Sequence, residues 1–115
     1  MRYDLEERTL KFAKDCIDLY KKVEKNVINN ELVKQSVRAT CSIGANYREA
    51  NDTITKKDFL HKSSICRREA KESKYWLELI LHANQKLSKE IEPLIDEALQ
   101  LARIFASISN KGKVK

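Results

Sequence analysis

Glycine and proline are nearly absent from this sequence, and their shortage limits the folds that it can adopt. Among 115 residues there are only 2 glycines and 1 proline. Folds made of many strands need frequent turns, and turns rely heavily on these two residue types. A chain with so few of them is expected to form long helices. Its length suits a single domain, which we place at residues 1–110.

Apolar residues recur at steps of three and four in four separate stretches, which is the spacing of one face of an α-helix. Asn29 and Asn30 separate the first stretch from the second, and residues 51–53 separate the second from the third. Thr55 is a suitable N-terminal cap for the third helix. The stretches predict helices at about residues 4–26, 31–50, 56–84 and 90–109. Short connections between them favour an all-α fold, an antiparallel up-down four-helix bundle.

Small residues line the apolar side of the second stretch, and Gly44 lies among them. A glycine inside a helix costs about 1 kcal/mol relative to alanine. We therefore expect a neighbouring helix to approach closely at Gly44.

The sequence offers no set of residues for a catalytic or metal site. It lacks a glycine-rich phosphate loop and a nucleophile elbow, and neither histidine follows a glutamate by three residues. Cys16, Cys41 and Cys66 lack C-x-x-C spacing and lie in apolar runs, where a thiol packs as a small hydrophobe. We therefore predict a protein that is not an enzyme and that uses no cofactor and no metal.

Membrane insertion and secretion are not expected from this sequence. It contains no run of 18 consecutive apolar residues, and residues 1–7 are too charged for a signal peptide. We predict a cytoplasmic protein that does not contact a membrane.

The net charge of +6 is concentrated in two places. Residues 56–75 contribute +4 and residues 111–115 contribute +3, whereas the rest of the chain sums to −1. Localised positive charge is typical of a chain that binds an anion, and nucleic acid is the commonest such partner. The alternative is a solvated helix face together with a flexible basic tail at residues 111–115 that aids solubility.

At 100° per residue, the third predicted helix has a core face, a basic face and a mixed flank. The basic face includes Tyr75 and six cations: Lys56, Lys57, Arg67, Arg68, Lys71 and Lys74. We predict that these cations bind the phosphates of RNA or DNA with little sequence specificity. The alternative is that Glu72 and Glu78 pair with nearby lysines and leave the face inert.

The mixed flank combines apolar and acidic side chains: Ile65, Glu69, Glu72, Trp76 and Leu79. Tryptophan is typical of residues that anchor protein interfaces, so we predict that this flank contacts another subunit. The alternative is that the flank belongs to a core face broader than a single seam.

Segments of the second and third predicted helices resemble the four-helix-bundle family of bacterial 23S rRNA intervening-sequence proteins. The segments are SIGANYREA at residues 42–50, KDFLHK at residues 57–62 and REAKESKYWL at residues 68–77. The family includes proteins encoded within insertions in large-subunit rRNA genes. It also includes the accessory variability determinant of diversity-generating retroelements. Gly44 is a departure, because many members carry proline or another small residue there.

The resemblance implies an up-down bundle that assembles as a homopentamer, and it implies no catalytic residues. It also implies binding to nucleic acid and to a reverse transcriptase. Together with the basic face, it leads us to predict a non-enzymatic, oligomeric accessory protein that binds RNA or DNA, a reverse transcriptase, or both. The alternative is a structural module that binds only other proteins. An rRNA-insertion protein and a retroelement accessory protein differ in their neighbouring genes, not in these residues.

Overall fold

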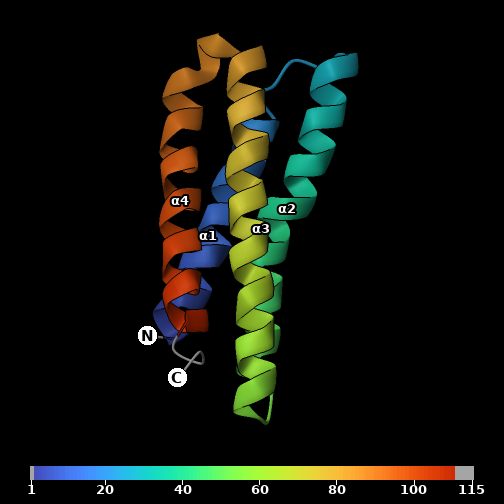
Figure 1. Ribbon diagram of the computed structural model, residues 1–115. Helices are drawn as coiled ribbons and strands as arrows, with labels where there is room; N and C mark the ends of the chain where they lie inside the picture. Colours follow the sequence, from blue (N-terminus) through green and yellow to red (C-terminus); the bar gives the residue numbers. More distant parts are fainter. Residues whose placement is uncertain (1, 111–115) are drawn as a thin grey trace.

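The computed structural model describes residues 2–110, which form four α-helices and one short 3₁₀ helix. These are α1 (Arg2–Tyr20), α2 (Val27–Asn51), α3 (Lys56–Ala83), η1 (Gln85–Leu87) and α4 (Ser88–Asn110). Successive α-helices run in opposite directions (Figure 1). The predicted all-α up-down bundle is therefore confirmed. The predicted basic tail at residues 111–115 lies outside the described residues.

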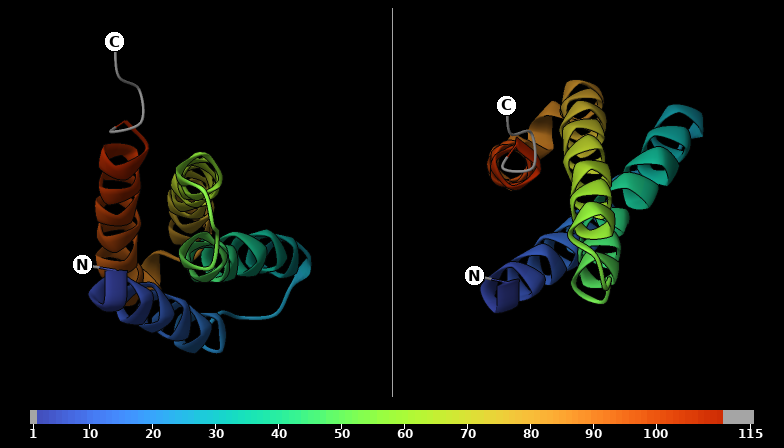
Figure 2. Two further views of the ribbon diagram at one scale, coloured as in Figure 1. Left: turned by 90° about the horizontal axis from the view of Figure 1, so that it is seen from below. Right: turned by 60° about the horizontal axis from the view of Figure 1, so that its bottom comes forward.

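Helix α3 occupies the centre of the packing. It lies between α2 and α4, with which it makes the most extensive contacts, whereas α1 packs mainly on α2 and less extensively on α4 (Figures 1 and 2). The exposed side chains of α3 include Arg68, Lys71 and Tyr75. One face of α3 therefore points away from the other three helices.

The core is built from the apolar faces of all four helices. Its largest fully buried side chains include Phe12, Ile43, Leu77, Leu101 and Phe105. The rings of Tyr47 and Phe105 pack edge to face, with their centroids 5.5 Å apart. The three- and four-residue spacing in the sequence correctly predicts which side of α1, α3 and α4 is buried. On α2 the buried side is turned toward Ser36 and Ile43, and Ala45, one of the small residues expected on the apolar side, is exposed.

Helix α1 approaches α2 closely at Gly44. A Cβ atom at this position would lie 2.9 Å from Oγ1 of Thr9 on α1. Thr9 is fully buried, and its hydroxyl donates to the carbonyl of Leu5 at 2.9 Å. The close helix approach that we expected at Gly44 is confirmed.

Small polar residues of α2 bind the other end of α1. The Tyr20 hydroxyl lies 2.6 Å from Ser36 Oγ and 3.0 Å from Thr40 Oγ1. Thr40 in turn donates to the carbonyl of Ser36 at 2.9 Å. Because all three hydroxyls are satisfied, they can be buried between the helices without a large desolvation cost.

The predicted boundary between the first two helices is wrong by more than the usual uncertainty of helix ends. Helix α1 ends at Tyr20 and not near residue 26, and α2 begins at Val27 and not near residue 31. The Asn26 side chain caps α2 by accepting a hydrogen bond from the backbone N–H of Asn29 at 2.8 Å. A strong cap at Asn26 therefore starts the helix four residues early.

Asn29 lies inside α2 and does not break it. Its side chain donates to the carbonyl of Glu24 at 2.8 Å. It also exchanges two hydrogen bonds, of 3.0 and 2.9 Å, with the side chain of Asn84 at the end of α3. An asparagine side chain that has these partners no longer competes for the backbone hydrogen bonds of its own helix.

The ends of the last two helices agree with the prediction to within two residues. Thr55 caps α3, since its Oγ1 accepts a hydrogen bond from the backbone N–H of Asp58 at 3.1 Å. Helix α4 follows directly on η1 and begins at Ser88. The predicted limits, residues 56–84 and 90–109, therefore describe both helices adequately.

Candidate nucleic-acid interface

The outward face of α3 is hollowed into a shallow groove, which we call the α3 groove. It has a volume of about 400 Å³ and is open to solvent. Six residues from successive turns of α3 line it: Ser64, Arg67, Arg68, Lys71, Glu72 and Tyr75. Residues at steps of three and four lie on one face of a helix, so the groove follows the helix axis.

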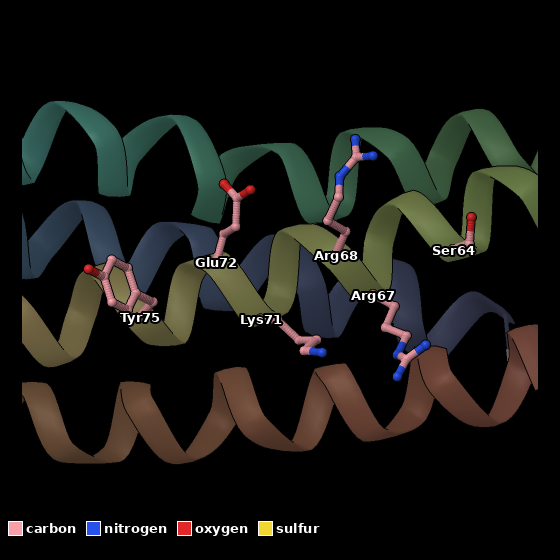
Figure 3. Close-up of a pocket in the computed structure, with 6 residues that line it drawn as sticks. All are labelled: Ser64, Arg67, Arg68, Lys71, Glu72 and Tyr75. Carbon is pink, nitrogen blue, oxygen red and sulfur yellow. The ribbon is translucent and has the colours of Figure 1, made fainter.

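Cationic side chains stand on both sides of the α3 groove (Figure 3). Arg67 and Lys71 extend toward α4, whereas Arg68 and Glu72 extend toward α2. Tyr75 lies at one end of the groove and Ser64 at the other. An anion placed along the groove would therefore meet positive charge from two directions.

The positive charge of the α3 groove is mostly uncompensated. Within residues 2–110, the side chains of Arg67 and Lys71 take part in no ion pair and no hydrogen bond. The largely exposed side chain of Arg68 lies 3.8 Å from Oε2 of Glu69, and Glu69 is already paired with Arg38. The one carboxylate of the groove, Glu72, instead accepts a hydrogen bond from Arg38 of α2 at 2.6 Å.

The other three predicted phosphate-binding residues lie outside the α3 groove. Lys74 donates a hydrogen bond to Glu78 at 2.8 Å. For this lysine, the alternative holds in which a nearby glutamate pairs with a cation of the basic face. Lys56 and Lys57 are exposed in the first turn of α3. They lie about 15 Å from Arg67 along the helix axis, at 1.5 Å per residue. The structure thus gathers three of the six predicted cations and separates the rest.

The acidic residues of the mixed flank bind α2 of the same chain. Arg38 of α2 lies 3.3 Å from Oε1 of Glu69 and 2.6 Å from Oε1 of Glu72. The pKa of Arg38 is raised above its ordinary value, chiefly by the hydrogen bond that its guanidinium donates to Glu72. Glu69 is buried in this contact. Both carboxylates are therefore already paired within a single chain.

The apolar residues of the mixed flank keep part of their surface exposed. Ile65, Trp76 and Leu79 are each half-buried. The ring of Trp76 packs edge to face with that of Tyr75, with centroids 5.2 Å apart. The apolar part of the mixed flank therefore extends to the end of the α3 groove.

Besides Glu72, which was assigned to the mixed flank, two groove residues are missing from the predicted phosphate-binding set: Ser64 and Tyr75. That set was chosen by charge, and neither residue is charged at neutral pH. Their separation of eleven residues, about three helical turns, is the signal that places both on the stripe of Arg68 and Lys71. The stripe could have been found by spacing alone.

The described part of the chain contains neither a metal-binding cluster nor a helix that could span a membrane. Across residues 2–110, no three histidine, cysteine, aspartate or glutamate side chains come together in a way that could hold a metal ion. None of the helices in this range combines the length and the apolar character that crossing a bilayer requires.

Comparison with known proteins places these features in a family. The model of the 23S rRNA-intervening sequence protein family matches residues 2–107. A 1.70 Å crystal structure of a protein of unknown function from the S23 ribosomal protein family, from Bacteroides thetaiotaomicron VPI-5482, is 31% identical in sequence. It superposes with a TM-score of 0.80 over 90% of this chain and 96% of that chain. No curated protein matches. The family match spans the α3 groove and almost all of the four helices, and this chain therefore belongs to the 23S rRNA-intervening sequence protein family.

Proposed function

We propose that this protein is a non-enzymatic nucleic-acid-binding protein that holds the phosphate backbone in the α3 groove. The observation that carries the proposal is the unpaired charge of Arg67 and Lys71 beside Arg68. Cations that are already paired gain little from a new anion, whereas unpaired ones gain a full partner. The net charge of +4 in residues 56–75 supports the same proposal.

The residues of the α3 groove suit a phosphate better than a base edge. The two arginines can each grip a phosphate with two parallel hydrogen bonds, and Lys71 acts as a point charge. Contacts of this kind fix the position of the nucleic acid but carry no sequence information. Binding is therefore proposed to be weakly sequence-specific and to depend on the release of condensed counterions.

The proposal is tested by reversing the charge of the α3 groove. Wild-type protein should bind fluorescently labelled RNA and DNA oligonucleotides, with an affinity that falls steeply as salt rises. The double variant Arg68→Glu/Lys71→Glu should lose this binding, measured by fluorescence anisotropy at two salt concentrations. Its helical circular-dichroism signal should stay unchanged, because both side chains are exposed.

A matched control separates the α3 groove from net charge. Lys14 and Lys21 are exposed on and just after α1, so Lys14→Glu/Lys21→Glu changes the total charge by the same amount. This control should retain most of the affinity. Wild-type affinity and salt dependence in the groove variant would refute the proposal. Weak binding that ignores salt would instead support the alternative, a module that binds only proteins.

A further inference from the structure

Tyr75 is an unusual residue for a solvent-exposed helix face. Its exposed fraction is 55%, and it is the only exposed aromatic residue among those whose side chains the structure describes. Its hydroxyl forms no hydrogen bond within residues 2–110. Burial of the ring in the core therefore does not explain Tyr75.

The ring of Tyr75 is held beside the cations of the α3 groove. Trp76 packs against it at an interplanar angle of 71°, which supports the ring from one side. Lys71 precedes Tyr75 by one turn and Arg68 by two, so they lie about 6 and 10 Å away along the axis. An aromatic ring and two cationic groups are thus aligned along one face of α3.

This alignment distinguishes between forms of nucleic acid. The faces of paired bases are stacked on each other inside a duplex, so a ring on a protein surface cannot reach them. An unpaired base offers its face for stacking, and single-strand binders combine aromatic platforms with a positively charged groove for this reason. Arginine side chains can also stack on such bases through their planar guanidinium groups.

We propose that the ligand of the α3 groove is single-stranded RNA or DNA, with one unpaired base stacked on Tyr75 and the adjoining phosphates at Lys71 and Arg68. This inference rests on the proposed function, because it assumes that the groove binds nucleic acid. It adds the strandedness of the ligand and a role for an uncharged residue. Stacking is independent of base identity, so the weak sequence specificity is retained.

Two substitutions of Tyr75 test the inference. Tyr75→Leu removes the aromatic ring but keeps an apolar side chain, and Tyr75→Phe keeps the ring but removes the hydroxyl. Anisotropy titrations would use an unstructured oligonucleotide and a duplex of the same length at one salt concentration. Tyr75→Leu should weaken single-strand binding about tenfold and leave duplex binding unchanged. Tyr75→Phe should bind as the wild type does.

A second readout does not depend on affinity. Trp76 is the only tryptophan of the chain and its ring is 5.2 Å from that of Tyr75, so its fluorescence reports on a base that stacks there. Saturating single strand should quench this emission in the wild type and in Tyr75→Phe, but much less in Tyr75→Leu. Circular dichroism and light scattering should show the same fold and size for all three proteins.

The possible failures are distinguishable. If Tyr75→Leu binds single strands as tightly as the wild type while Arg68→Glu/Lys71→Glu does not bind, the groove binds phosphates but the stacking inference is overturned. If duplex and single strand bind equally and both lose affinity in Tyr75→Leu, the preference for single strands is overturned. If the wild type binds neither, the proposed function fails as well.

Discussion

Burial divides the three cysteines into two chemical classes. Cys16 and Cys66 are fully buried, whereas Cys41 is half-buried. Burial raises the pKa of the Cys16 and Cys66 thiols to about 12, because a thiolate in the core would lose its hydration. Since the thiolate is the reactive form, both side chains are unreactive at neutral pH.

We predict that iodoacetamide modifies native protein at Cys41 alone, and at all three cysteines after unfolding in urea. Peptide mass spectrometry would locate the adducts, and native Cys66 reacting as fast as Cys41 would contradict this assignment.

The buried thiols also make stability depend on pH. An unburied thiol loses its proton near pH 8.5, well below the pH at which the buried thiols lose theirs. The unfolded state therefore binds fewer protons above that pH, and the free energy of unfolding should fall between about pH 8.5 and about pH 12.

At the scale of single residues, the sequence predicts angular position and pairing within one helix, but not pairing between helices. Lys71 and Lys74 are three residues apart on one face of α3, but only Lys74 has a carboxylate, Glu78, four residues further on, and the two are paired. Lys71 has Tyr75 at that spacing and is unpaired, and Glu72 is paired with Arg38. Arg38 comes from another helix, and a helical wheel of α3 contains no information about it.

At the scale of the helices, the contact between α1 and α2 depends on Gly44. Alanine would raise the helix propensity at this position by about 1 kcal/mol. Its Cβ, however, would lie 2.9 Å from Oγ1 of Thr9, a short buried side chain that has no room to move. We expect the overlap to outweigh the propensity, so that Gly44→Ala lowers the free energy of unfolding by about 1–2 kcal/mol.

Urea unfolding followed by circular dichroism would measure this effect, and a double-mutant cycle with Thr9→Ala identifies its cause. Thr9→Ala removes the hydroxyl that an alanine at position 44 would meet first. The same Gly44→Ala substitution should therefore cost less in the Thr9→Ala background. An equal cost in both backgrounds would show that Thr9 is not responsible.

Most helix faces were predictable from sequence, whereas one helix boundary was not. The buried seam of α3, which includes Cys66, Ala70 and Leu77, follows directly from a local repeat. The start of α2 depends instead on the cap at Asn26 and on Asn29, whose side-chain partner Asn84 is 55 residues away. Local patterns treat an asparagine as a helix breaker because they cannot include a distant hydrogen-bond partner.

At the scale of the whole molecule, we propose that copies of this chain assemble through the exposed parts of Ile65, Trp76 and Leu79. The homopentamer that the family resemblance implies is the expected assembly. Sedimentation velocity should show an oligomer for the wild type and a shift toward monomer for Trp76→Ala, because truncating an interface anchor removes buried apolar area.

The matched control for Trp76→Ala is Leu10→Ala, because Leu10 is an apolar residue of α1 with an exposed fraction of 42%. This variant should sediment as the wild type does. A wild-type protein that sediments as a monomer at micromolar concentration would exclude the proposed assembly. Equal dissociation by both substitutions would indicate a general loss of stability and not an interface at Trp76.

The most extensive helix contacts join neighbours along the chain: α1 with α2, α2 with α3, and α3 with α4. Contacts between segments that are close in sequence require little loop closure, and chains dominated by them fold quickly. During synthesis, each new helix that leaves the ribosome therefore finds its main partner already made. Only the smaller contact between α1 and α4 joins helices that are not neighbours in the sequence, so apolar surface is covered progressively while the chain is still growing.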